Sequence, residues 1–197
     1  MNYLAHIFLS GNQDGIKIGN FIADFVPGKK YLNYPEDIQK GILLHRKIDT
    51  YTDAHPIFRH SKKRLFGDFR HYSAVIVDMF YDHFLARNFT DYSEQPLEVY
   101  VSSFYALLKK NQHLLPDNVK RVLPVMMKYN WLLSYRELDK LQDILKQMNN
   151  RTRHNSNLHH SISILKTDYS LFYDDFQVFF EDILEAKKEM HKSLKID

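Results

Sequence analysis

Apolar residues recur at the spacing of an α-helix along almost the whole of this 197-residue chain, and no other feature restricts its fold as strongly. The spacing predicts helices at Lys17–Val26, Pro35–Thr50, Pro56–Phe66, Tyr72–Asn88, Pro96–Asn111, Asp117–Trp131, Tyr135–Asn150 and Tyr169–Lys195. Six glycines and six prolines are too few for a turn-rich β-sandwich or β-barrel. The sequence therefore predicts an all-α fold, a single-domain helical bundle that spans residues 1–197.

The composition restricts the chemistry that the chain can perform. It contains no cysteine, which excludes disulfides, thiolate metal sites and cysteine nucleophiles. Any bound metal must therefore have histidine, aspartate or glutamate ligands. A net charge of +3 is too small to predict a nucleic-acid partner. The N-terminal residues do not resemble a basic leader, and no apolar run reaches the ~18 residues that a membrane span needs. We therefore expect a cytoplasmic protein that contacts neither nucleic acid nor membrane.

Two aspartates stand in the strongly apolar segment Ala74–Leu85. Asp78 and Asp82 are four residues apart, so on a helix they share one face. Two carboxylates so close repel each other unless a positive group lies between them. A divalent cation would supply that charge, and we predict both residues as metal ligands. The alternative is a pair of salt bridges to neighbouring helices.

A histidine and an aspartate have the same four-residue spacing in the predicted helix Pro35–Thr50. At this spacing His45 and Asp49 can bind one metal, or the carboxylate can orient the imidazole. A histidine satisfied within the core is the alternative. Asp53, one turn further on, is a candidate for an additional site, or for the cap of the helix that begins near Pro56.

Three more polar residues have apolar neighbours near the N-terminus. Asp24 and Asn20 are one turn apart, and His6 lies within Tyr3–Phe8. We predict Asp24 as a metal ligand, and Asn20 and His6 as members of a possible additional site. An ordinary core histidine is the alternative for His6. Together with the residues above, they supply enough imidazoles and carboxylates for one or two oxygen-rich sites, which suit Mn²⁺ or Mg²⁺ better than structural Zn²⁺.

Several blocks of the sequence match a known family. The blocks are Met1–His6, Gly19–Val26, His45–Asp49 with Thr52–Asp53, Asp78–Leu85 and, more weakly, Trp131–Leu132 with Tyr135–Arg136. In these blocks, and in their order, the chain resembles the bacterial acyl carrier protein phosphodiesterases, also called acyl carrier protein hydrolases. The resemblance extends through most of the chain. It implies a distant relation to the helical HD-type metal-dependent phosphohydrolases, although this chain has no contiguous His-Asp pair and carries the reversed order at Asp82–His83.

The resemblance also implies a function. Such an enzyme would hydrolyse the 4′-phosphopantetheine group from holo-acyl carrier protein and leave the apo-protein. A divalent metal, Mn²⁺ by this resemblance, would activate the attacking water. The leaving group is a serine alkoxide, which needs a general acid. His83 and His45 are candidates for a metal ligand or for the acid, and Arg46 would neutralise charge on the phosphoryl group.

Acyl carrier proteins are acidic, so the resemblance further implies a basic docking surface. The predicted helix Pro56–Phe66 carries a basic run, and one more arginine follows it. These residues, which we call the basic set, are Arg59, Lys62, Lys63, Arg64 and Arg70. The alternative is an ordinary solvated helix face.

Two other functions remain open at this stage. One is an HD-like phosphohydrolase that acts on nucleotides or another small phosphoester with the same metal site. The other is a non-catalytic helical binding module, in which the carboxylates form only salt bridges.

Overall fold

The computed structural model describes residues 2–149 and 156–196, and within these ranges it contains helices and no strands. The prediction of an all-α fold is confirmed. The α-helices are α1 (Tyr3–Leu9), α2 (Asp14–Ile22), α3 (Glu36–Ala54), α4 (Pro56–Phe69), α5 (Ser73–Arg87), α6 (Leu97–Lys110), α7 (Asp117–Lys128), α8 (Trp131–Ser134), α9 (Leu138–Asn149), α10 (Ser161–Thr167) and α11 (Tyr169–Leu194). Over the described ranges, none of these helices is long and apolar enough to cross a membrane.

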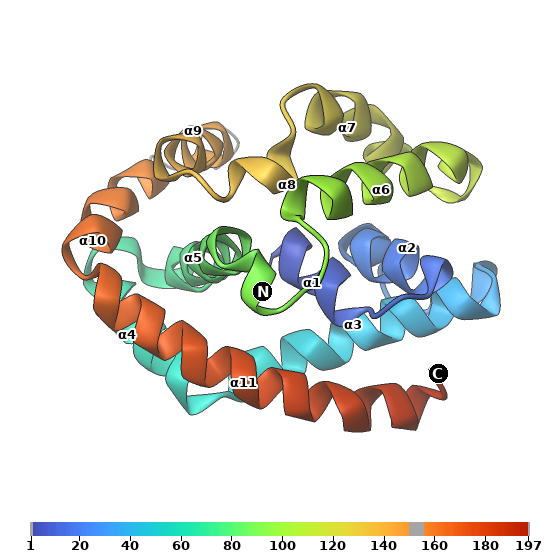
Figure 1. Ribbon diagram of the computed structural model, residues 1–197, viewed down its shortest axis with the longest axis horizontal. Helices are drawn as coiled ribbons and strands as arrows, with labels where there is room; N and C mark the ends of the chain where they lie inside the picture. Colours follow the sequence, from blue (N-terminus) through green and yellow to red (C-terminus); the bar gives the residue numbers. More distant parts are fainter. Residues whose placement is uncertain (1, 150–155, 197) are drawn as a thin grey trace.

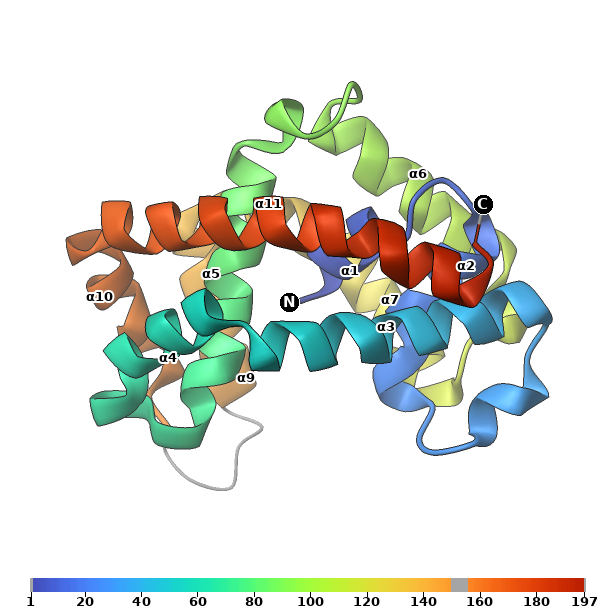
Figure 2. The same cartoon turned by 90° about the horizontal axis from the view of Figure 1, so that it is seen from below.

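The helices are stacked in three layers (Figure 1). The middle layer contains α1, α2 and α5; α3, α4 and α11 lie on one side of it, and α6 to α9 on the other. The long helix α11 runs beside α3 and α4 along the length of the molecule (Figure 2). Helix α1 is therefore enclosed by the fold, and polar residues on it are removed from solvent.

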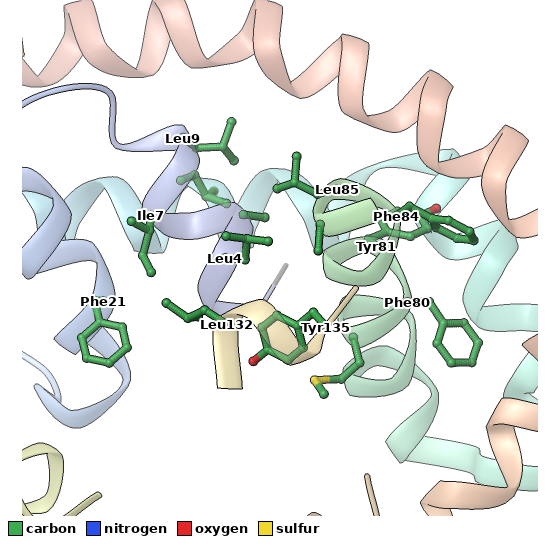
Figure 3. Close-up of a cluster of buried hydrophobic side chains, with 14 of the residues drawn as sticks. Leu4, Ile7, Leu9, Phe21, Phe80, Tyr81, Phe84, Leu85, Leu132 and Tyr135 are labelled. Atoms are coloured by element: carbon green, nitrogen blue, oxygen red, sulfur yellow. The ribbon is translucent and has the colours of Figure 1, made fainter. Parts of the chain in front are cut away.

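Helix α5 is buried over most of its length. Phe80, Tyr81 and Phe84 are fully buried, and their rings contact aromatic rings of α11. Leu132 and Tyr135, which come from α8 and its end, pack beside α1 and α5 (Figure 3). Because so little of α5 faces solvent, its polar residues must find partners inside the protein.

Helices α2 and α3 pack unusually close together. Gly19 of α2 faces Gly41 of α3, and a Cβ atom at either position would overlap the backbone of the opposite helix. This approach lets the backbone carbonyl of Asn20 accept a hydrogen bond from His45, about one turn along α3 from Gly41. The two glycines thus set the distance between the elements that carry the site.

Helix α1 is not among the helices predicted from the sequence, because its apolar run is short. Its first turn is held by two side chains. The Asn2 side chain accepts a hydrogen bond from the N–H of Tyr3, and the Asp82 carboxylate of α5 accepts one from Leu4. A local pattern does not reveal support from a residue so distant in the chain.

Several predicted helix limits are wrong. Helix α3 continues to Ala54 instead of ending at Thr50, and α2 begins at Asp14 and ends at Ile22 instead of spanning Lys17–Val26.

Helix α4 continues past Gly67 and ends where Arg70 adopts a left-handed φ of 50°. The helix predicted to continue to Trp131 instead ends at Lys128, because Asn130 has a φ of 46° and starts a separate short helix, α8.

Candidate metal centre

Two helices bring three potential metal ligands together. His6 of α1 and His45 and Asp49 of α3 have ligand atoms that all lie within 4.8 Å of one another. One Asp49 oxygen is 3.1 Å from His6 Nε2, and the other is 3.1 Å from His45 Nε2. The two imidazoles are stacked with their centroids 3.9 Å apart. Both histidines are buried, whereas 46% of the Asp49 side chain is exposed, so the group is reached from the Asp49 side.

Asn20 orients both imidazoles. Its amide nitrogen donates to the His6 carbonyl (2.8 Å) and to Ser10 Oγ (2.9 Å), which directs its side-chain oxygen toward the rings. That oxygen lies 2.8 Å from His6 Nδ1 and 3.1 Å from His45 Nδ1, and the Asn20 carbonyl lies 2.9 Å from His45 Nδ1. Because these oxygens only accept, each Nδ1 carries a proton, and each ring in its neutral form presents an Nε2 lone pair. This is the arrangement that metal-binding histidines adopt.

The Nε2 atom of His6 shows that the group is incomplete on its own. It is buried, and it forms no hydrogen bond with any residue that the structure describes, although an Asp49 oxygen is 3.1 Å away. That contact therefore lacks hydrogen-bond geometry. A buried polar atom without a partner costs about 1–3 kcal/mol. Two imidazole nitrogens and a carboxylate around one point are ligands that divalent cations take, so the residues fit a divalent metal ion.

The electrostatics of the group also suit a cation. Burial, reinforced by the neighbouring His45, lowers the pKa of His6 to about 4. Burial opposes charge on His45 as well, but the carboxylates of Asp24 and Asp49 outweigh it and raise its pKa to about 9. Burial would raise the pKa of Asp49, yet its close contacts with the imidazoles of His45 and His6 hold that pKa well below its usual range. A bound cation would take the place of the proton on His45.

The group opens into a cavity of about 370 Å³, which we call the metal pocket. Its wall includes three of the predicted carboxylates, Asp24, Asp53 and Asp78. Asp24 Oδ1 is 3.2 Å from His45 Nε2, and this hydrogen bond lowers the pKa of Asp24. Burial raises the pKa of Asp78. The structure thus brings together residues that the sequence divides between a main and an additional site.

Asp82 and His83 do not line the metal pocket. The Asp82 carboxylate is fully buried and accepts hydrogen bonds from the N–H groups of Asn2 (3.2 Å), Leu4 (2.8 Å) and Ala5 (3.3 Å) at the start of α1. Both oxygens are therefore occupied by α1. Its predicted role as a metal ligand stays a prediction, and the partners it has are different from those expected.

His83, predicted as a catalytic residue, is held in the core. Its Nδ1 is 2.8 Å from the Tyr135 carbonyl, and its Nε2 is 3.0 Å from the Tyr169 hydroxyl. The side chain is fully buried. Both ring nitrogens have partners, so the imidazole joins α5 to α11 and to the residue after α8.

Arg46 also has a set of partners outside the pocket. It donates hydrogen bonds to the carbonyls of Val26 (3.0 Å) and Gly28 (2.8 Å), and its guanidinium stacks over Tyr31 at 5.3 Å. It therefore holds the loop that follows Asp24. Its predicted contact with a phosphoryl group stays a prediction.

The basic set divides into two kinds of residue. Arg64 lies 3.5 Å from Asp175 of α11, and its guanidinium packs over Phe172. Arg59, Lys63 and Arg70 are exposed, and the others are half-buried. Helix α4 joins α3 to α5, and both neighbours contribute residues to the metal pocket. The exposed members of the basic set thus lie on or just after α4, in the segment between two helices that line the pocket.

The sequence pattern missed three polar residues of the pocket, Asn2, His71 and Thr52. His71, in the short 3₁₀ helix before α5, is exposed and lies on the wall. Thr52 is buried there, and its hydroxyl has no hydrogen-bond partner in the described part of the chain. Neither His71 nor Thr52 stands in an apolar run, so a pattern of polar residues among apolar neighbours does not reveal them.

The fold and the site define a helical protein with a histidine–carboxylate centre fit for a divalent cation. The family described as acyl carrier protein phosphodiesterase matches residues 1–183. Proteins named acyl carrier protein phosphodiesterase from Salmonella agona, Salmonella dublin and Salmonella newport are each 33% identical over 184 residues, which is 91% of this chain and 94% of theirs. The chain belongs to the acyl carrier protein phosphodiesterase family, which confirms the resemblance. No solved structure gives a match, and the likeness to HD-type phosphohydrolases stays a prediction.

Proposed function

We propose that this protein is a cytoplasmic metal-dependent phosphodiesterase that removes 4′-phosphopantetheine from holo-acyl carrier protein and releases the apo-protein. Family membership supports the reaction. The observation that carries the metal dependence is the convergence of His6, His45 and Asp49, with Asn20 fixing the tautomer of both imidazoles. We propose Mn²⁺ as the ion, with Mg²⁺ as the alternative, because further carboxylates surround the group.

The residues of the pocket have separate tasks in this reaction. His6, His45 and Asp49 would hold the ion, and Asp24 and Asp78 would complete its oxygen-rich surroundings. When bound, the ion supplies positive charge to the phosphodiester and makes a water molecule more acidic. Asn20 fixes a proton on each Nδ1 atom, so that each Nε2 atom is the one directed toward the ion.

The leaving serine oxygen needs a proton. His83 is enclosed and does not line the pocket, and His45 is committed to Asp24 and Asp49. His71 is the histidine of the pocket wall outside the metal group, and it is exposed. We therefore assign the general acid to His71, since imidazole is the side chain that most often has this role.

The carrier protein would dock on α4. Arg59 and Lys63 are exposed on α4, Arg70 is exposed just after its end, and Phe66 between them is 56% exposed. Cationic side chains around one apolar ring match a partner that is acidic with apolar contacts at its centre. Because α3 and α5, on either side of α4, reach the pocket, a protein bound on α4 has its prosthetic group near the metal.

Mass spectrometry tests the proposed reaction. Holo-acyl carrier protein is incubated with the enzyme and Mn²⁺, and its mass is expected to fall by that of the phosphopantetheine group. The Asp49→Asn enzyme is the control and is expected to leave the holo-protein intact. An unchanged holo-protein with the wild-type enzyme, together with hydrolysis of nucleotides, would replace this proposal by the nucleotide phosphohydrolase alternative.

A further inference from the structure

A second cleft adjoins the metal pocket. It has a volume of about 370 Å³ and shares three wall residues with the metal pocket, Asn2, Asp24 and Val75. The two cavities are therefore adjacent. From the shared wall the second cleft extends between α5, α8 and α9, and we call it the α8–α9 cleft.

The walls of the α8–α9 cleft are mostly apolar. Met79 of α5, Trp131 of α8, and Ile144 and Met148 of α9 are its principal apolar side chains. Trp131 and Ile144 are only partly buried by the protein's own residues. A volume of about 300–1,000 Å³ with apolar walls and few polar groups is typical of a small-molecule site.

The polar groups of the cleft stand at separate points along it. Asn2 lies at the end shared with the metal pocket, where its side-chain amide also contacts the Met79 sulfur. Gln147 lies further along on α9. Tyr135, seen in Figure 3, is the residue that follows α8. An occupant that is mainly apolar, but carries amide or hydroxyl groups at intervals, matches this wall.

We propose that the α8–α9 cleft binds the pantetheine arm of the substrate while the phosphodiester lies in the metal pocket. This inference rests on the proposed function. The arm is a thin chain with a geminal dimethyl group, a hydroxyl and two amides, and it is bonded to the same phosphorus that the metal pocket would hold. Because the two cavities are adjacent along Asn2, Asp24 and Val75, the α8–α9 cleft is the apolar cavity beside the phosphorus to which the arm is attached.

The far end of the cleft adjoins a further cavity. Trp131, Ile144 and Gln147 line a third cavity of about 810 Å³. This third cavity is therefore the neighbouring space toward which the thiol end of the arm, or an acyl chain attached to it, would extend. Substrate recognition is thus divided, with the protein on α4 and the arm on α8 and α9.

Intrinsic fluorescence tests this inference without any turnover. Trp131 is the only tryptophan in the chain, and it lies in the cleft. Titration with 4′-phosphopantetheine in the presence of Mg²⁺ is expected to give a saturable blue shift of the emission, because the arm covers the indole. Inorganic phosphate, which reaches only the metal pocket, is expected to give none. Equal responses to the two ligands, or none to either, would overturn the proposal.

Variants that narrow the cleft provide an independent test. Ile144→Phe combined with Met148→Phe is expected to raise KM for holo-acyl carrier protein about tenfold or more, since overfilling a packed site is costly. The loss on bis(p-nitrophenyl) phosphate, which has no arm, is expected to be much smaller. Val178→Phe, at a position 49% exposed on α11, is the matched control and should behave as wild type on both substrates.

These outcomes separate this inference from the proposed function. If holo-acyl carrier protein is not hydrolysed but 4′-phosphopantetheine still shifts the Trp131 emission and phosphate does not, the proposed reaction fails and the arm site stands. If hydrolysis proceeds while the emission is silent and the narrowed variant matches Val178→Phe, the reaction stands and the arm site fails.

Discussion

Two histidine–aspartate groups in this protein have similar sequence settings and opposite structural surroundings. His45 and Asp49 lie in an apolar stretch of α3, and Asp82 and His83 lie in an apolar stretch of α5. At the first group, Asn20 occupies only the Nδ1 atoms and leaves the Nε2 atoms directed at Asp49. At the second, protein groups occupy both imidazole nitrogens and both carboxylate oxygens. At the ligand site the Nε2 atoms thus face a carboxylate that can bind the same cation. At the structural site, backbone and hydroxyl groups already contact every ring nitrogen and carboxylate oxygen.

The two groups also differ in charge: the α5 group favours neutral side chains, and the group in the metal pocket favours charged ones. Burial raises the pKa of Asp82 to about 7 and lowers that of His83 to about 4, so the interior favours the neutral form of each. At the metal pocket the mutual contacts outweigh burial and favour the charged forms of His45 and Asp49. The pocket therefore maintains charge that a cation can use, and the α5 pair avoids charge.

The largest expected difference between the two groups concerns activity. Asp49→Asn is expected to reduce kcat/KM for holo-acyl carrier protein by more than about 100-fold, because a direct ligand should cost more than the 10–100-fold typical of its supporting residues. The measurement is apo-protein formation followed by mass spectrometry, with Asp174→Asn on the exposed face of α11 as the matched control. Retained activity in Asp49→Asn would remove Asp49 from the ligand set.

The next effect is on stability. Asp82→Ala removes the acceptor for three N–H groups at the start of α1 and is expected to lower the free energy of unfolding by about 2–4 kcal/mol. Urea unfolding of the metal-free protein measures this. Asp82→Asn keeps one acceptor oxygen, so its free energy of unfolding should fall by less than that of Asp82→Ala. Unchanged stability together with lost metal binding would instead identify Asp82 as a ligand.

The pH dependence of stability tests the state of His83. Its folded pKa of about 4 lies below the ordinary value of 6.5, so the unfolded chain binds more protons between these values. The stabilisation from neutral His83 is thus complete above pH 6.5 and is lost as the pH falls toward 4, by at most about 3 kcal/mol. Denaturant unfolding of wild type and His83→Gln, both without metal, is the measurement. Equal slopes for the two proteins across this window would contradict the assignment.

The smallest expected effect concerns docking. Lys62→Glu with Lys63→Glu is expected to raise KM for holo-acyl carrier protein several-fold and to leave hydrolysis of bis(p-nitrophenyl) phosphate nearly unchanged, since rim charges act mainly on encounter. Added salt should reduce wild-type activity on the carrier protein more steeply than on the small diester. Lys109→Glu with Lys110→Glu, on the exposed end of α6, is the matched control. If the two double variants behave alike, the α4 lysines do not contribute to docking and belong to an ordinary solvated helix face.

The sequence is sufficient for the all-α class, for most of the long helices and for part of the site, but not for the short helices α1 and α10. Residues that stand out in apolar runs, such as Asp24, His45 and Asp49, do line one pocket. The pattern alone does not separate them from Asp82 and His83, because an apolar run shows that a polar residue is buried and not what it contacts. His6 is assigned to a separate site because the pattern misses α1, whose first turn depends on Asp82 from α5. His71 is missed because it is exposed.

Titration calorimetry with Mn²⁺ tests the central claim most directly, because it measures the metal centre without a substrate. The wild-type protein, Asp49→Asn and Asp82→Asn are compared at one pH, with folding of each verified by circular dichroism. We predict that Asp49→Asn weakens Mn²⁺ binding by more than about tenfold and that Asp82→Asn binds as wild type does. Loss of binding in Asp82→Asn with binding retained in Asp49→Asn would contradict the account, as would a wild-type protein that does not bind Mn²⁺.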